Sequence, residues 1–330
     1  MKNLIIATLC LLFFFTTIPA WGAEIPNANI KSPEVRKALD LLAAPSRENF
    51  EKSRLILIEI LKKNPRQVEA HMGLVHLRIT EYTLFPQTGA GGLGEALKHA
   101  DAALKVKPEL EDAYRKKSLI LFLIGRKEEG LKVLQTALRK WPGSQELHEA
   151  YLAYLLNLGK VKEAELFSDL KQSRVKNKRE MLIRLGQVWQ QAGYAEQSDE
   201  CYEHSLNIGE TPQAWAALGR SFMLKKNYPQ AIEFFQKALV IDAKHYVIYN
   251  DLAFCYFQVG QPREAIQWIE PYTRAYPDDL GALGNLAGLY EGAGEKVKAR
   301  LTWMKVRTST RDPQQARLAG ERLEKLKEQK

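Results

Sequence analysis

Residues 211–245 read TPQAWAALGRSFMLKKNYPQAIEFFQKALVIDAKH. Apolar and small residues recur at helical spacing in both halves of this stretch: Trp215, Leu218, Gly219 and Phe222, then Ala231, Phe235 and Ala238. Such spacing is typical of amphipathic helices, and Lys226-Asn227-Tyr228 interrupts it. The stretch therefore predicts two helices joined by a short turn. One such pair cannot bury its apolar face alone, so copies should stack beside it.

The same pattern recurs along the chain about every 34 residues. When the repeats are aligned with one another, one position early in each second helix always holds a small residue. These residues are Ser53, Ala96, Gly130, Ala164, Ser198, Ala231, Ala265 and Ala299. Small side chains at one register indicate close approach of the paired helices. The turn column holds Gly125, Gly159, Gly193, Gly260 and Gly294, with Lys226 as the exception. Glycine there fits a helix end that needs a left-handed residue.

The run Trp215-x-x-Leu218-Gly219-x-x-Phe222, followed by Ala231-x-x-x-Phe235, resembles the tetratricopeptide repeat signature. This resemblance implies an all-α, right-handed superhelical solenoid of about eight helix-turn-helix repeats over residues 33–312. The repeats should span about 33–67, 68–110, 111–144, 145–178, 179–211, 212–245, 246–279 and 280–312. Residues 313–330 should form a charged C-terminal capping helix, because the end of an array needs a polar outer face.

The start of the chain is typical of an export signal. Lys2 precedes an apolar run from Leu4 to Ile18, which is too short to span a membrane comfortably. Small residues favour cleavage after Gly22, so residues 1–22 are predicted to be a signal peptide and 23–32 a flexible lead-in. An uncleaved N-terminal anchor is the alternative. We therefore expect a periplasmic or secreted protein with no stable membrane span after cleavage.

The chain has 330 residues and a formal net charge of +9, which favours acidic partners or anionic envelope surfaces. Two cysteines remain after the signal, Cys201 and Cys255. They lie in repeats separated by a whole repeat, so both are interpreted as buried apolar residues rather than a disulfide.

Repeat 2 is longer than the others, and its extra residues fall within 83–94. The sequence Gly89-x-Gly91-x-x-Gly94 matches a dinucleotide-binding fingerprint. That fingerprint works only after a strand, within a βαβ unit, and here a helix precedes it. We expect a flexible inserted loop, or alternatively a mobile flap with Phe85 and Leu93 at its tips.

No other motif for chemistry is present. The sequence lacks a phosphate-binding loop and a haem-attachment motif, and its six histidines are scattered over several repeats. No catalytic residue, metal ligand or cofactor is therefore predicted, and no residue in the sequence suggests a catalytic mechanism.

The resemblance does imply a binding surface, because the first helices of this family line a concave groove. The groove positions of this chain suit an extended or helical peptide with apolar anchors and some acidic character. They are Arg115, Leu119, Phe122, Gln187, Gln190, Arg220, Met223, Asn250, Phe254 and Phe257. The alternative is that Leu119, Phe122 and Phe254 simply pack between neighbouring repeats.

A basic run lies at the junction of repeats 4 and 5: Lys171, Arg174, Lys176, Lys178 and Arg179. It forms either a solvated face or a docking patch for an acidic protein or an anionic envelope polymer. Nucleic acid is disfavoured, because the chain is expected to be exported and no aromatic platform accompanies the cations.

These features favour a non-catalytic scaffold or adaptor in the cell envelope, which binds another envelope protein or a peptide in the groove to help assemble a multiprotein complex. Two alternatives stay open: a small-molecule or glycan binding module, and an accessory subunit of an envelope enzyme or transporter. The sequence indicates no oligomeric state.

Overall fold

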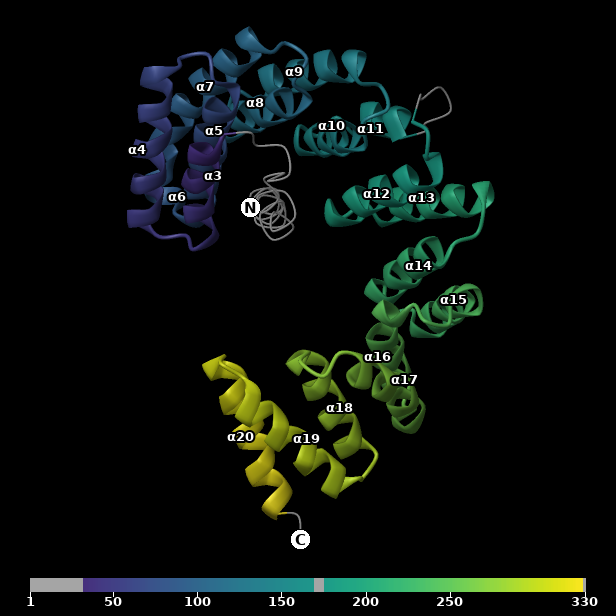
Figure 1. The fold of residues 1–330 in the computed structure, drawn as a ribbon. Helices are drawn as coiled ribbons and strands as arrows, with labels where there is room; N and C mark the ends of the chain where they lie inside the picture. Colours follow the sequence, from purple (N-terminus) through teal and green to yellow (C-terminus); the bar gives the residue numbers. More distant parts are fainter. Residues whose placement is uncertain (1–31, 169–174, 329–330) are drawn as a thin grey trace. The chain divides into compact units, whose positions relative to one another are not determined.

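A computed structural model describes residues 32–168 and 175–328, and within these residues it contains helices and turns but no strand (Figure 1). The chain divides into two compact units, Met1–Tyr194 and Ala195–Lys330. The boundary falls between α12 and α13, inside the stretch expected to be repeat 5. The predicted signal peptide and most of the predicted lead-in lie outside the described residues.

The first unit consists of antiparallel helix pairs. It pairs α3 (Pro33–Asp40) with α4 (Arg47–Lys63), α5 (Val68–Leu84) with α7 (Leu93–Val106), α8 (Glu111–Leu123) with α9 (Lys127–Lys140), and α10 (Gln145–Asn157) with α11 (Val161–Ser168). A 3-10 turn, η2 (Leu41–Ala43), follows α3, and the unit ends with α12 (Lys178–Gln191). Successive pairs contact one another through α4 and α5, α7 and α8, and α9 and α10.

The second unit continues the same construction. After α13 (Ala195–Ile208), it pairs α14 (Pro212–Leu224) with α15 (Tyr228–Ile241), α16 (Tyr249–Gln258) with α17 (Pro262–Ala275), and α18 (Leu280–Gly292) with α19 (Lys296–Ser309). The turn η4 (Tyr246–Ile248) precedes α16, and α20 (Pro313–Glu328) lies against α19. Ala319 and Leu323 of α20 pack on Leu283 and Trp303, so α20 covers the last pair as a capping helix should.

The small-residue column lies at the core of each pair. All of its residues are buried in the structure: Ser53, Ala96, Gly130, Ala164, Ser198, Ala231, Ala265 and Ala299. At Gly130 an added Cβ would lie 2.9 Å from the carbonyl oxygen of Ser118, which shows how closely α8 and α9 approach. The physical reason given for the column, close helix contact, is confirmed.

The turn glycines adopt the left-handed conformation that the pattern predicts. Their φ values are 84° at Gly125, 71° at Gly159, 86° at Gly193, 80° at Gly260 and 77° at Gly294. At the first of these turns, the amide of Arg126 donates to the carbonyl of Leu121 at 2.8 Å and the amide of Gly125 to that of Phe122 at 3.1 Å. These bonds close the helix end in the way a Schellman motif does.

Lys226 occupies the same conformation with φ 61°, and its turn makes the equivalent bonds. A side chain at positive φ costs about 1 kcal/mol or more relative to glycine. Lys226→Gly should therefore raise the free energy of unfolding of the second unit by about 1 kcal/mol. Urea unfolding followed by tryptophan fluorescence would show a higher midpoint. Gly260→Lys is the matched control and should lower it; no change in either variant would contradict the account.

The inserted segment of repeat 2 is helical, so the expectation of a flexible loop or flap is wrong. It forms α6 (Pro86–Gly89) and the 3-10 turn η3 (Ala90–Gly92) before α7. Gly89 is buried, and a Cβ there would lie 2.6 Å from the backbone of Tyr82. Leu93 is fully buried in the core, and Phe85 packs edge-on against Phe50 at 6.2 Å between ring centroids. The small glycines thus let the insertion pack on α5.

Candidate functional site

Two exposed aromatic side chains stand out among the predicted groove residues, and both come from α16. Phe254 and Phe257 are 46% and 44% exposed. The ring of Tyr228, at the start of α15, meets Phe254 edge-on at 6.0 Å. A Cβ on Gly292 of α18 would lie 3.2 Å from the Phe257 ring, so glycine makes room for that ring. We call Tyr228, Phe254 and Phe257 the aromatic face.

The neighbouring first helix, α18, carries no side chain at two of its equivalent positions. Gly284 and Gly288 occupy the positions of Asn250 and Phe254, and an added Cβ on Gly288 would meet nothing within 4 Å. Glu291, at the position of Phe257, is half-buried and lies 3.6 Å from Arg322 of α20. Glycine inside a helix costs about 1 kcal/mol relative to alanine, and no neighbouring atom requires it at Gly288. Asn285 donates its Nδ2 to Oδ1 of Asn250 on α16 at 3.0 Å, which ties the two helices together. The result is an open backbone beside the aromatic face.

Arg220 and Met223 of α14 do not add a free cation or an exposed anchor. The Nε of Arg220 donates to Oδ2 of Asp251 at 2.6 Å, across two successive repeats. Met223 is half-buried against the core of the second unit. Arg220 is thus paired with Asp251, and a role for Arg220 in binding acidic groups of a ligand stays a prediction.

In the first unit, Phe122 and Leu119 of α8 pack between repeats. Phe122 is buried and lies on Tyr154 of α10 with ring centroids 4.4 Å apart. Leu119 is half-buried and packs on the cluster around Val75 and Leu93. Phe122 and Leu119 therefore pack between neighbouring repeats, as the alternative interpretation predicts. Phe254 does not, because its side chain is exposed.

The remaining first-helix groups of this unit are mostly paired charges. Asp112 accepts hydrogen bonds from Arg115 at 2.6 Å, and Lys116 lies 3.1 Å from it. Burial opposes the charge of Asp112, but the two cations outweigh it and lower the pKa of that carboxyl. Farther along, Arg184 of α12 pairs with Glu149 of α10 at 3.0 Å. Burial of Glu149 raises the pKa of its carboxyl despite this pairing.

The two glutamines of α12 differ in their surroundings. Gln187 is exposed, so its amide is open to a ligand. Gln190 is half-buried, and its Nε2 atom has no hydrogen-bond partner within the described part of the chain.

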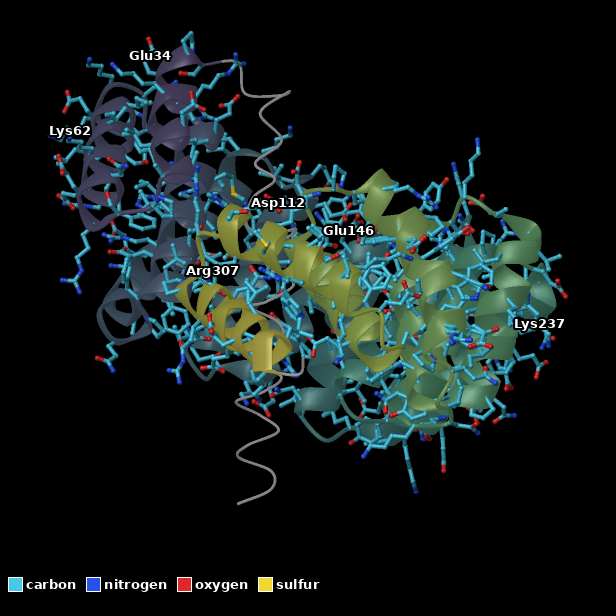
Figure 2. The ribbon with its side chains drawn as sticks, turned by 90° about the horizontal axis from the view of Figure 1, so that it is seen from below. Glu34, Lys62, Asp112, Glu146, Lys237 and Arg307 are labelled. Carbon is cyan, nitrogen blue, oxygen red and sulfur yellow. The ribbon has the colours of Figure 1, made fainter. Side chains whose placement is uncertain are left out.

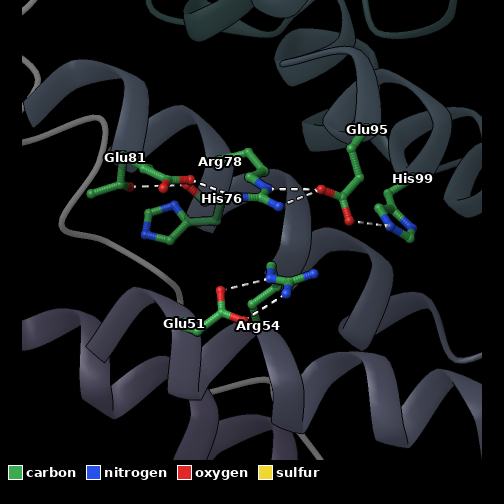
Figure 3. A network of polar contacts seen from close by, with 8 residues as sticks. Glu51, Arg54, His76, Arg78, Glu81, Glu95 and His99 are labelled. Carbon is green, nitrogen blue, oxygen red and sulfur yellow. Dashed lines mark hydrogen bonds and ion pairs between the residues drawn. The ribbon is translucent and has the colours of Figure 1, made fainter. Parts of the chain in front are cut away.

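A polar network joins α5 to α7, and a separate ion pair on α4 lies close to it (Figure 3). Arg78 donates through Nε to Glu95 at 2.9 Å and through Nη1 to Glu81 at 2.7 Å. Nearby, Arg54 makes two bonds to Glu51, at 2.9 Å and 2.6 Å. The Arg78–Glu95 pair spans the insertion of repeat 2 and holds α5 and α7 together. Arg78 and Glu95 are 17 residues apart in sequence, so no motif signals this pair.

A histidine pair adjoins this network. The Nδ1 atoms of His71 and His99 lie 2.9 Å apart, and Nε2 of His71 lies 3.0 Å from the carbonyl oxygen of Pro65. His71 therefore donates from Nε2 and accepts at Nδ1, while His99 donates from Nδ1. Burial lowers the pKa of His99, which favours the neutral form of that ring. Residues 32–168 and 175–328 contain no cluster of three or more groups that could hold a metal ion.

Two family models, both described as tetratricopeptide repeat, match residues 89–145 and 222–286. One match falls in each compact unit, on helix pairs that contain the buried small residues and the turn glycines. The chain is a tetratricopeptide-repeat protein. A search of curated proteins finds no relative of it.

Comparison with solved structures finds several that are similar to this tetratricopeptide-repeat protein, and Tom70 shares its fold. Yeast Tom70 is 16% identical and superposes with a TM-score of 0.56, covering 91% of this chain; this chain spans 65% of the length of that one. A tetratricopeptide repeat protein from Parabacteroides merdae is 17% identical, with a TM-score of 0.41 over 78% of this chain and 98% of its own. The Cut9–Hcn1 hetero-tetramer of the APC/C gives 13% identity, a TM-score of 0.45, and coverage of 92% and 65%. At these identities the likeness concerns the fold alone.

The predicted basic run of this tetratricopeptide-repeat protein is only partly described. Lys171 and Arg174 lie outside the described residues. Lys176 is exposed, whereas Lys178 and Arg179 are half-buried at the start of α12. The run stays a prediction as a docking patch.

Both cysteines are buried in unpaired form, as the interpretation of them as apolar residues requires. Burial raises the pKa of Cys201 and of Cys255 to about 12, so both thiols stay protonated at neutral pH. Among the described helices, none is long and apolar enough to cross a membrane.

Proposed function

We propose that this tetratricopeptide-repeat protein is a non-catalytic scaffold of the cell envelope that binds a segment of another protein on the aromatic face. The carrying observation is the exposure of Phe254 and Phe257 on one side of α16. Adjacent aromatic side chains of this kind are typical anchors at protein interfaces. The repeat fold supports the coarser role, because it is that of a protein-protein interaction scaffold.

The chemistry of the face indicates what it binds. Its two exposed phenylalanine rings supply apolar contact, and the open backbone of α18 at Gly288 lets a partner main chain come close. Since Arg220 is paired with Asp251, recognition should depend on apolar anchors of the partner more than on its acidity. An extended or helical peptide with one or two apolar residues fits this surface.

Location in the envelope rests on the sequence of residues 1–22, with its short apolar run behind Lys2. Recovery of a C-terminally tagged chain in the osmotic-shock fraction of its host would support export. Recovery only in the cytosol would contradict it.

The structure gives no support to the alternative of a small-molecule or glycan binding module. A mobile flap at Gly89–Gly94 would have covered such a ligand, but Gly89 is packed on the backbone of Tyr82. An accessory subunit of an envelope enzyme or transporter would use the same protein-binding face and is a special case of the proposal.

Removing both rings should abolish partner capture. We expect a tagged Phe254→Ser/Phe257→Ser chain to retain its fold, because both side chains are largely exposed, and to lose at least about tenfold in partner affinity. The measurement is co-purification from envelope extracts with quantitative mass spectrometry. The matched control is Leu166→Ser/Val240→Ser, which removes two exposed apolar side chains from the second helices α11 and α15. Equal partner recovery from the double-phenylalanine variant and the native chain would refute the proposal.

A further inference from the structure

The outward side of α19 carries apolar side chains where a surface helix should be polar. Val297 is 75% exposed, Leu301 63% and Met304 46%. On the opposite side, Ala299 and Trp303 are buried against α18 and α20. The apolar stripe therefore points away from the second unit, and packing within that unit does not explain it.

The spacing of the stripe matches a coiled-coil seam. Val297, Leu301, Met304 and Thr308 follow one another at intervals of four, three and four residues, as successive d, a, d and a positions do. The positions that flank such a seam, e and g, are all cationic here. They are Lys298, Arg300, Lys305 and Arg307.

These cations have little to neutralise them. Helix α19 contains no acidic residue, and within the described residues only Lys298 of the four has an ion pair, with Glu295 at 2.7 Å. Arg307 is labelled on this helix in Figure 2. An apolar seam with cations on both edges is complementary to a helix with an apolar seam and anions on both edges.

We propose that α19 docks an amphipathic helix of another protein, with apolar residues at its a and d positions and Asp or Glu at e and g. This surface is separate from the aromatic face. Because both edges of α19 are cationic, a parallel and an antiparallel acidic helix would both pair with it.

Other occupants fit less well. A second copy of α19 would set cations against cations, which disfavours self-association through this face. The undescribed segments of this chain cannot supply the acidic helix, because residues 1–31, 169–174 and 329–330 contain only Glu24 and Asp169 as acidic residues. A lipid surface usually takes a broader apolar face with aromatic residues, whereas this stripe has the narrow width of a seam and no aromatic residue.

The test uses the full chain and a synthetic, fluorescein-labelled helical peptide of three heptads, with Leu at a and d and Glu at e and g. Fluorescence anisotropy should show saturable binding that weakens as salt is added, because exposed ion pairs are screened. The same peptide with Lys at e and g should not bind. Leu301→Asp should weaken binding about tenfold or more.

A charge reversal makes the test specific. Arg300→Glu/Arg307→Glu should lose the Glu peptide and gain the Lys peptide, which a merely adhesive apolar patch would not do. Both side chains are exposed, and circular dichroism would verify that the variant is folded. Equal binding of both peptides by the native chain would overturn the proposal. So would failure to bind the Glu peptide while the chain co-sediments with anionic phosphatidylglycerol vesicles in a Leu301-dependent way. Phe254→Ser/Phe257→Ser should bind the Glu peptide unchanged, which separates this inference from the proposed function.

Discussion

Replacing Phe235 with alanine should destabilise the second unit by about 3–5 kcal/mol. Phe235 of α15 is fully buried, and its ring fills the space that Gly219 of α14 leaves open: a Cβ on Gly219 would lie 2.7 Å from it. Truncation removes the ring from a core that also contains Ala231 and Leu252. Because helix pairs stabilise one another through neighbouring interfaces, the loss should spread to the adjacent pairs.

Urea unfolding would measure this loss, and amide hydrogen exchange would locate it in α14–α17. Phe254→Ala is the matched control, because it removes the same side chain from an exposed position. It should change stability by less than about 0.5 kcal/mol. Similar losses for the two variants would show that the assignment of core and surface on these helices is wrong.

Acidification from pH 6.5 toward pH 3 should destabilise the first unit through His76. Burial of this side chain in α5, reinforced by the nearby Lys116, lowers its pKa from 6.5 to about 3, and Asp112 opposes the shift. Between these pH values the unfolded chain binds a proton at His76 and the folded chain does not. Protonation thus favours the unfolded state, so stability falls with pH by up to about 1.4 kcal/mol per unit until pH 3.

The measurement is urea unfolding at several pH values between 7 and 3.5. His76→Leu should flatten the dependence, because the buried titrating group is gone, while contributions from carboxylates remain. His204→Gln, which replaces an exposed histidine of the second unit, is the matched control for the loss of a histidine. A His76→Leu variant with an unchanged pH dependence would mean that His76 is not the group responsible.

The repeating parts of the fold could be predicted from sequence because a local physical cause fixes each of them. Close helix approach requires small residues such as Gly130 and Ala231, and the turn requires positive φ at Gly125 and its equivalents. These causes act within one helix pair, so spacing alone exposes them. The division into two units at Tyr194 has no such local marker.

The prediction for the inserted segment is wrong because one of its glycines, Gly89, has a tertiary role. Gly89, Gly91 and Gly94 are typical of a loop when taken alone. In the structure Pro86 begins a short helix, and Gly89 allows that helix to lie on the backbone of Tyr82. Only the tertiary contact with α5 distinguishes a packed short helix from a flexible loop.

The exposure of the groove side chains also could not be predicted from spacing alone. Phe122 and Phe257 occupy the same register of their repeats. Tyr154 of the next repeat covers Phe122, whereas α18 of the next repeat presents Gly292 to Phe257 and leaves that ring exposed. Exposure therefore depends on the neighbouring helix rather than on the position itself. The seam of α19 could not be recognised from spacing, because this helix has apolar residues on two sides. Ala299 and Trp303 are buried, whereas Val297, Leu301 and Met304 are exposed, and only the structure distinguishes the two sides.

The most direct test of the central claim, that the aromatic face binds a partner protein, is site-specific photo-cross-linking in living cells. A photoreactive phenylalanine analogue at position 257 should give a discrete adduct with one protein, and Phe254→Ser should reduce its yield. The same analogue at position 240 of α15 should not give that adduct. Identical adducts from positions 257 and 240, or an adduct at 257 that Phe254→Ser leaves unchanged, would contradict the account.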